Sequence, residues 1–129
     1  MKNLIFVFLS GCFLLFSIKV NADVFFCSEK DSVGFAPNNS GQYISGLFEQ
    51  GRFKAKIDFI NKTFVSNEIP LTDYNCKILP FNNGMTCNQA GFLITVNKND
   101  YKFVLTKAFG YAIGKKDTVS VSIGNCDKF

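Results

Sequence analysis

The chain has 129 residues, of which 14 are Lys or Arg, 10 are Asp or Glu and none is His. The lack of histidine excludes the Ser-His-Asp and Cys-His catalytic arrangements, and neither a zinc-protease motif nor a phosphate-binding glycine loop is present. The net charge of +4 falls toward neutrality once the N-terminal segment is removed, so we expect no nucleic-acid partner.

The N-terminus has the layout of a secretory signal peptide. Met1–Asn3 is positively charged, Leu4–Ile18 is mostly apolar, and Val20–Ala22 offers small or apolar residues before a cut at Asp23. The apolar run is shorter than the roughly 20 residues of a spanning helix, which favours cleavage over an uncleaved anchor. We therefore expect a signal peptide over residues 1–22 and a periplasmic or secreted product.

A second interpretation of this segment is a lipoprotein signal. Leu9-Ser10-Gly11-Cys12 resembles a lipobox, in which Cys12 would carry lipid and become the new N-terminus. However, the apolar run continues past Cys12, whereas a lipobox normally closes such a run. A membrane association is thus expected only if the signal is uncleaved or Cys12 is lipidated.

Residues 23–129 are expected to form a single disulfide-bonded domain, because they are long enough for one core and contain no linker or repeat. Alternation of apolar and polar residues dominates and predicts strands with one buried face. The clearest strands are Arg52–Phe59, Phe92–Asn97, Tyr101–Thr106 and Thr118–Ile123; weaker ones are Val24–Ser28, Ser32–Phe35, Tyr43–Phe48, Phe64–Asn67, Tyr74–Leu79 and Met85–Asn88. We expect a loop at Ala36–Gly41 and a hairpin around Asn97–Asp100.

Short strands with frequent turns are typical of all-β sandwiches and barrels. No segment after residue 22 shows a sustained helical apolar pattern. The sequence therefore predicts an all-β fold: one antiparallel meander, closed as a small barrel or folded as a sandwich.

Four cysteines remain after signal removal, which is typical of a disulfide framework in a small exported domain. Four cysteines allow three pairings. We favour Cys27–Cys126, which ties the two ends of the domain together, and Cys76–Cys87, which closes a segment rich in turn residues. A metal site is disfavoured because there is no close cysteine pair and no histidine, so we expect no metal and no cofactor.

Carboxylates are the remaining candidates for catalysis. Paired carboxylates could hydrolyse glycosidic bonds, but nothing in the sequence pairs those available, which are Glu49, Asp58, Glu68, Asp73 and Asp117. We therefore assign no catalytic residue and expect a protein that is not an enzyme.

Arg52, Lys54 and Lys56 form a basic stripe on one face of a predicted strand. Such a stripe can contact an anionic glycan, a lipid head group or an acidic protein, or it can be a solvated face that guards a strand edge. The many phenylalanines offer a similar choice, since they can line an apolar cavity or simply fill a small barrel. If the chain binds a ligand, the basic stripe is the candidate contact.

The cysteine framework resembles that of small exported proteins of unknown function from Gram-negative bacteria. The similar features are Cys27, Gly34-Phe35, Cys76, Cys87, Gly110-Tyr111 and the ending Asp117–Cys126. The terminal cysteine pair and the strand count are also similar, more distantly, to the periplasmic inhibitors of C-type lysozyme, which are small β-barrels. Neither resemblance implies a catalytic residue.

Taken together, these features predict an exported, non-enzymatic β domain. Its partner is expected to be an envelope protein, a glycan or a small apolar ligand. The alternatives are a small carboxylate-dependent hydrolase of envelope polymers and a purely structural envelope component.

Overall fold

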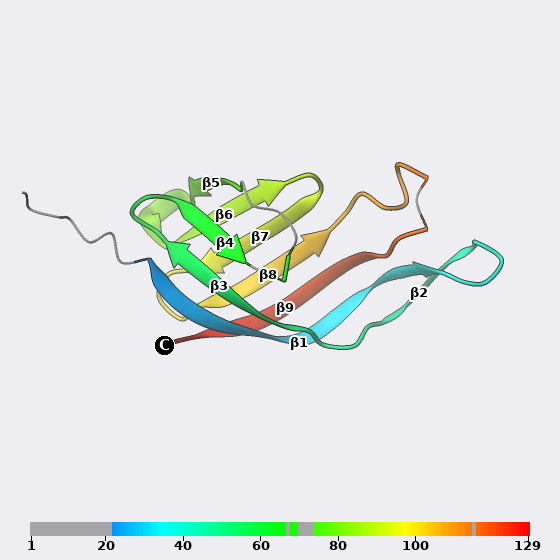
Figure 1. The fold of residues 1–129 in the computed structure, drawn as a ribbon, viewed down its shortest axis with the longest axis horizontal. Helices are drawn as coiled ribbons and strands as arrows, with labels where there is room; N and C mark the ends of the chain where they lie inside the picture. The colour runs from blue at the N-terminus through cyan, green and yellow to red at the C-terminus, as the bar shows by residue number, and fades with distance from the viewer. Residues whose placement is uncertain (1–21, 67, 70–73, 115) are drawn as a thin grey trace, which may run out of the picture.

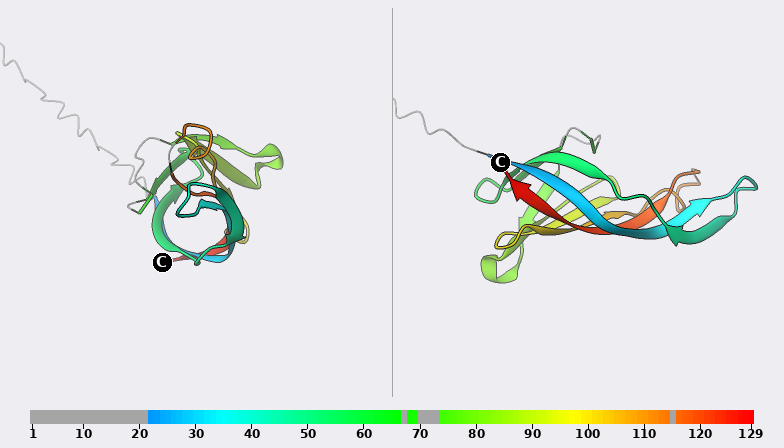
Figure 2. Two further views of the ribbon diagram at one scale, coloured as in Figure 1. Left: turned by 90° about the vertical axis from the view of Figure 1, so that its right-hand side faces the viewer. Right: turned by 90° about the horizontal axis from the view of Figure 1, so that it is seen from below.

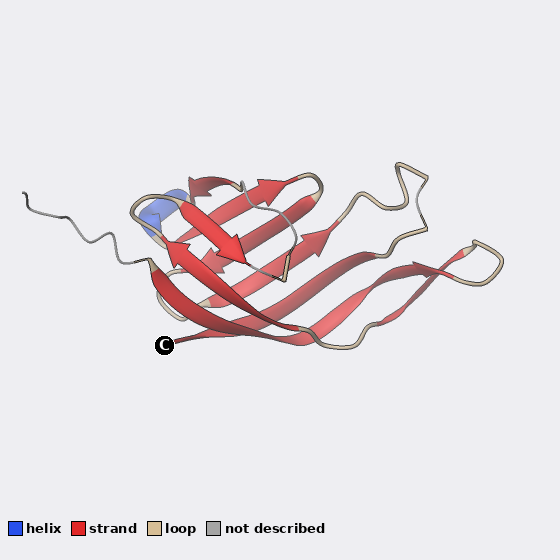
Figure 3. Cartoon of the chain, in the orientation of Figure 1, coloured by secondary structure: helices blue, strands red, loops and turns tan. Residues whose placement is uncertain are grey.

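The fold is described from a computed structural model, which covers residues 22–66, 68–69, 74–114 and 116–129. The predicted signal peptide, except for Ala22, and the carboxylate Asp73 lie outside the described residues. The strands are β1 (Asp23–Pro37), β2 (Tyr43–Leu47), β3 (Arg52–Asp58), β4 (Thr63–Ser66), β5 (Asn75–Ile78), β6 (Gly84–Gln89), β7 (Phe92–Asn97), β8 (Lys102–Lys107) and β9 (Val119–Lys128). A single 3-10 turn, η1 (Pro80–Asn82), is the only helical element in the described ranges (Figure 3).

The strands form one antiparallel sheet that is nearly closed into a barrel (Figure 1). The strand order is β4-β3-β1-β9-β8-β7-β6-β5, and β2 pairs with the second half of β1. The two ends of this strand order are β4 and β5. The ring centroids of Phe64 and Tyr74 lie 5.0 Å apart across the gap between these two strands. The predicted all-β fold is confirmed, and of the two alternatives the sheet comes nearer to the barrel, which it almost closes.

Strand β1 joins two strands that the sequence analysis kept apart. The pairing of β1 with β9 shifts register between Glu29 and Asp31, which makes Lys30 the extra residue of a β-bulge. A bulge interrupts the alternation without ending the strand, so the pattern on either side looks like two strands. The long β1 therefore borders β3 with its first half and β2 with its second half.

The loop expected at Ala36–Gly41 is shorter than predicted. Ala36 and Pro37 belong to β1, where they lie opposite Ile44 and Tyr43. Proline is tolerated there because it ends the strand. The remaining turn is held by the side chain of Asn38, whose Oδ1 accepts hydrogen bonds from the backbone N–H groups of Ser40 and Gln42.

The barrel interior holds the core. The fully buried large side chains are Phe25, Phe64, Ile57, Met85, Ile94 and Val96, together with Cys27 and Cys87, one half-cystine from each disulfide bond. The structure links Cys27 to Cys126 and Cys76 to Cys87, which is the pairing favoured from the sequence. Four phenylalanines, Phe25, Phe53, Phe64 and Phe103, belong to this core, and two disulfide bonds are typical of exported, oxidising compartments.

Beyond the barrel, β1 and β2 continue as a two-stranded arm beside the start of β9 (Figures 1 and 2). The turn at residues 38–42 forms the tip of this arm. One long edge of β2 in this arm has no neighbouring strand among the described residues.

Candidate functional site

Strand β9 turns its apolar residues outward, contrary to the prediction. Val121 and Ile123 are 43% and 49% exposed, whereas Ser122 between them is 3% exposed. The disulfide explains this orientation, because Cys126 must face the interior to reach Cys27 and alternation then sends every second residue inward. Ser122 is accommodated inside because its hydroxyl donates a 2.8 Å hydrogen bond to Ser32 Oγ.

The outward residues of β9 line up with apolar residues of neighbouring strands. We call this line the outer row: it consists of Leu93, Thr106, Val121, Val33 and Leu47, each opposite the next on adjoining strands. The four apolar members are exposed. Large exposed apolar patches on soluble proteins often mark interaction surfaces.

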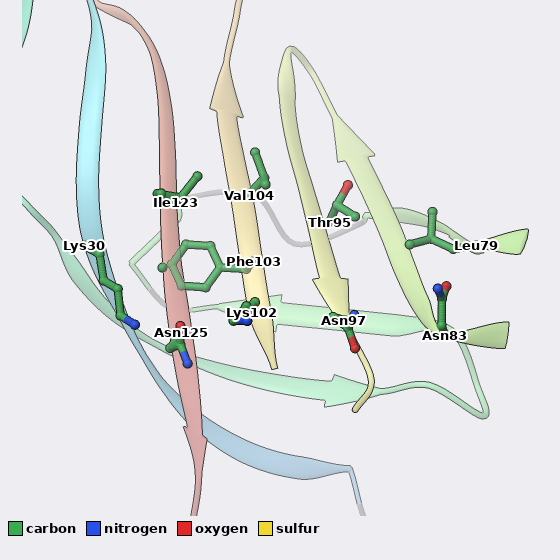
Figure 4. Close-up of a pocket in the computed structure, with 11 residues that line it drawn as sticks. Lys30, Leu79, Asn83, Thr95, Asn97, Lys102, Phe103, Val104, Ile123 and Asn125 are labelled. Atoms are coloured by element: carbon green, nitrogen blue, oxygen red, sulfur yellow. The ribbon is translucent and has the colours of Figure 1, made fainter. Parts of the chain in front are cut away.

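A shallow hollow lies next to the outer row. It has a volume of about 500 Å³ and crosses β7, β8 and β9 on the outside of the sheet (Figure 4). We call it the outer hollow. It is lined by Lys30, Leu79, Asn83, Thr95, Asn97, Lys102, Phe103, Val104, Ile123, Gly124 and Asn125.

The lining of the outer hollow is divided into two sides. Thr95, Val104 and Ile123 are opposite one another in the sheet and form a mainly apolar side. The polar side chains Lys30, Asn83, Asn97, Lys102 and Asn125 form the other side (Figure 4). A ligand that fills the hollow would therefore meet methyl groups at one end and amides and ammonium groups at the other.

Gly124 shapes the floor of this hollow. A Cβ at this position would collide with the carbonyl oxygen of Ser28 and the ring of Phe103. Glycine is therefore required for the Phe103 ring to pack beneath β9. The same absence of a side chain lets the ring contribute to the apolar floor.

The two lysines of the outer hollow differ in their partners. Lys102 forms an exposed ion pair with Asp100 at 3.0 Å, and its hydrogen bond lowers the pKa of the Asp100 carboxyl. Lys30 projects from the β1 bulge and forms no ion pair with any described residue. Lys30 is therefore the ammonium group at the hollow that is available to an anion.

Arg52, Lys54 and Lys56 are exposed on the outer side of β3. Four polar residues on adjoining strands lie opposite one another in the order Arg52, Ser28, Asn125 and Lys102. This polar row leads from Arg52 to the outer hollow. Lys54 and Lys56 instead border a smaller hollow of about 350 Å³ with Val24 and Val65. The structure thus brings only Arg52 of the predicted basic stripe into line with the outer hollow, and none of the three residues lines it.

A further hollow of about 420 Å³ lies at the arm, lined by Phe35, Tyr43, Tyr111 and Val119. The rings of Tyr43 and Tyr111 are 4.9 Å apart between centroids, and the Tyr43 hydroxyl donates a 2.7 Å hydrogen bond to the Asp117 carbonyl. These contacts hold the chain after β8 against the arm. The hollow therefore lies between the arm and the segment that precedes β9.

The candidate carboxylates occupy local structural positions. Asp58 caps the turn after β3, where Oδ1 accepts backbone N–H bonds from Ile60 and Asn61 and Oδ2 accepts one from the Asn61 amide. These bonds, led by those from Asn61, lower the pKa of the Asp58 carboxyl. Asp117 pairs with Lys107 at 2.7 Å. Glu49 and Glu68 are exposed.

Within the described ranges, no group of three or more Cys, Asp or Glu side chains is arranged to hold a metal ion. No helix in the same ranges has the length and apolar character needed to cross a membrane. No protein-family model, curated protein or solved structure shows significant similarity to the chain. The resemblances stated from the sequence therefore stay predictions.

Sequence analysis missed the outer hollow and the outer row. The signal was nevertheless present in the spacing of β9, because Val121 and Ile123 stand at odd distances from Cys126. If Cys126 faces Cys27 in the core, residues at odd distances from it face outward. The lining residues from β7 and β8 could not be found in this way, since their inclusion depends on strand register.

Proposed function

We propose that this protein is an exported, non-enzymatic β domain that binds a small amphiphile with an anionic head group in the outer hollow. The observation that carries the proposal is the division of the hollow into an apolar side and a polar side that includes Lys30. Small-molecule sites combine mostly apolar walls with a few polar groups that orient the ligand.

The size and composition of the outer hollow favour this class of ligand. Its volume of about 500 Å³ is within the usual range for small-molecule sites. The side chains of Val104 and Ile123 offer contacts to a short alkyl or aryl group, and Lys30 offers a charge-assisted hydrogen bond to a carboxylate, sulfonate or phosphate. Three asparagine amides supply further hydrogen bonds to head-group oxygens.

The proposed location is the periplasm or the outside of the cell. Two disulfide bonds, together with the signal-like N-terminus, support export. An amphiphile that forms part of an envelope would be available in either compartment. Whether the segment before Asp23 is cleaved or lipidated is decided by intact mass of the exported protein.

The test is a binding titration with a dansylated undecanoic acid as the probe, read by the rise in its fluorescence. Lys30→Gln should weaken binding of this anionic probe about tenfold, the size expected when a charge-assisted hydrogen bond is lost. The same substitution should leave an uncharged dansylated undecanol almost unaffected. Val104→Thr keeps the side-chain shape but adds a hydroxyl, and should weaken both probes.

Lys56→Gln is the matched control, because it removes the same charge from the same sheet outside the outer hollow. If Lys30→Gln and Lys56→Gln weaken binding of the anionic probe equally, the probe is attracted by the overall positive charge of the protein, and the proposed binding site is wrong. Absence of saturable binding to the native protein would also overturn the proposal.

A protein partner is the second candidate function, and the exposed outer row favours it. The experiment that tests it is inhibition of C-type lysozyme by the purified protein. Val121→Ser should abolish any inhibition that uses the outer row, whereas Lys56→Gln should not.

A further inference from the structure

The edge of β2 that faces away from β1 has no strand beside it among the described residues. β2 pairs only with β1, while β4 covers β3 only from Ala55 onward. In Figure 2 the arm extends past the barrel, which leaves the edge of β2 on the outside of the molecule. An uncovered edge offers a row of backbone N–H and C=O groups that another extended strand can pair with.

The hydrogen-bond pattern identifies which residues of β2 present these groups. The Phe48 N–H bonds to the Ser32 carbonyl, and the Asn38 N–H bonds to the Gln42 carbonyl. In an antiparallel pair every second residue faces its partner, so Ile44 and Gly46 bond to β1. Ser45 and Leu47 consequently direct their N–H and C=O groups to the uncovered edge.

Natural edge strands usually carry a feature that prevents pairing, such as a lysine, a proline or a bulge. The β2 sequence Tyr43-Ile44-Ser45-Gly46-Leu47 has none of these. It also exposes apolar side chains on both faces: Leu47 is 83% exposed on the outer face and Ile44 is 59% exposed on the other. Exposure of these apolar side chains to water is energetically unfavourable.

The sequence of β2 is complementary to itself. If two copies pair antiparallel about a two-fold axis at Ser45, the two Ser45 residues exchange a pair of backbone hydrogen bonds. In this register Leu47 lies opposite Tyr43 of the second copy, and Ile44 lies opposite Gly46 of the second copy. Each large apolar side chain then meets an aromatic ring or the space above a glycine.

Charges are compatible with this register. No residue of β2 (Tyr43–Leu47) or of the turn at residues 38–42 carries a charge. No two like charges therefore face each other along the edge. The outer row, which ends at Leu47, would continue into the second molecule.

We propose that the uncovered edge of β2 is a homodimer interface, in which a second copy of this chain adds its own β2 antiparallel about Ser45. The two arms form one continuous sheet between two barrels. This interface is independent of the ligand proposed for the outer hollow.

The first measurement is analytical ultracentrifugation of the exported, fully oxidised protein from about 1 μM to about 1 mM. We expect a dimer that forms with rising concentration. Ser45→Pro removes the N–H at the two-fold axis and should give a monomer, while Ser45→Ala keeps the backbone and should dimerise. Leu47→Lys should weaken the dimer at least tenfold, and Leu93→Lys, the same change elsewhere in the outer row, should not.

The second measurement is amide hydrogen exchange of the native protein at the two ends of that concentration range. Dimerisation should slow exchange at Ser45 and Leu47 at least about tenfold and leave Gly46, which already bonds to β1, little changed. This readout needs no variant, so it stands even if Ser45→Pro fails to fold. A monomer at the highest concentration, a dimer that survives Ser45→Pro, or unchanged exchange at Ser45 would overturn the proposal.

Discussion

Cys27 and Cys126 lie directly opposite each other on β1 and β9, with their Cα atoms 3.9 Å apart, and are joined by a disulfide bond. They are 99 residues apart in sequence. The bond therefore holds together the first and last strands of the fold and also decides which side of β9 faces the core.

The two disulfide bonds should stabilise the protein unequally. Cys76 and Cys87 are separated by 11 residues, and replacing both with alanine should lower the free energy of unfolding by about 3 kcal/mol in the chain-entropy model. Replacing Cys27 and Cys126 should cost more, about 4 to 5 kcal/mol, because they close a much longer loop. Urea unfolding of both double variants tests this order, and an equal loss in the two would contradict it.

Ser32 and Ser122 should be energetically coupled. Their hydroxyls are hydrogen-bonded in the buried space between β1 and β9. Either single change to alanine leaves the other hydroxyl unpaired and should lower the free energy of unfolding by about 1 to 2 kcal/mol. The double change removes both hydroxyls, so its cost should be smaller than the sum of the single costs. Strict additivity in this double-mutant cycle would show that the bond is unimportant.

Tyr74→Phe should stabilise the protein. The Tyr74 hydroxyl is buried without a hydrogen-bond partner in the described part of the chain, while its ring packs against Phe64. Phenylalanine keeps the ring and removes the unpaired group, which should raise the free energy of unfolding by about 1 kcal/mol. Thermal or urea unfolding at neutral pH measures the change, and a loss of stability would mean that the hydroxyl has a partner.

The same residue predicts a response to alkaline pH. Burial raises the pKa of Tyr74 to about 12 from the ordinary value of 10.0. The unfolded chain therefore loses this proton first, and the native state should lose stability as the pH rises from about 10 to about 12. Tyr74→Phe should reduce that loss, compared by urea unfolding at about pH 9 and about pH 11. Identical pH dependence in the two proteins would be the contrary result.

Gly124→Ala and Gly46→Ala should have opposite effects. A Cβ at Gly124 collides with backbone and with the Phe103 ring, so we expect a loss of about 2 kcal/mol or more. A Cβ at Gly46 meets nothing within 4 Å, and alanine there should raise the free energy of unfolding by about 0.5 kcal/mol through the unfolded state. Measured together by urea unfolding, a similar change in both would rule out the packing role of Gly124.

Local patterns in the sequence predicted the local parts of the fold. The hairpin of β7 and β8 follows from two alternating segments around the turn residues Asn97–Asp100, and the structure contains it. Strand β3 likewise matches the alternation of Arg52–Phe59. In both cases the information needed is contained within neighbouring residues.

The outer face of β9 shows where such patterns fail. Alternation says that two faces differ but does not say which one is buried. The prediction took the valines and isoleucine as the buried side, whereas the Cys27–Cys126 bond turns Ser122 and Cys126 inward. The outer hollow depends in addition on the register of β9 against β8 and β1, which is set by contacts between residues far apart in the sequence.

Strand β1 belongs to both the barrel and the arm, and this has a mechanical consequence. Its pairing with β9 is continuous from Phe25 to Phe35, apart from the bulge at Lys30. A pull applied at the arm tip therefore acts lengthwise along this ladder, so that many backbone hydrogen bonds share the load instead of opening one by one. The covalent bond between Cys27 and Cys126 then stops any sliding of β1 past β9.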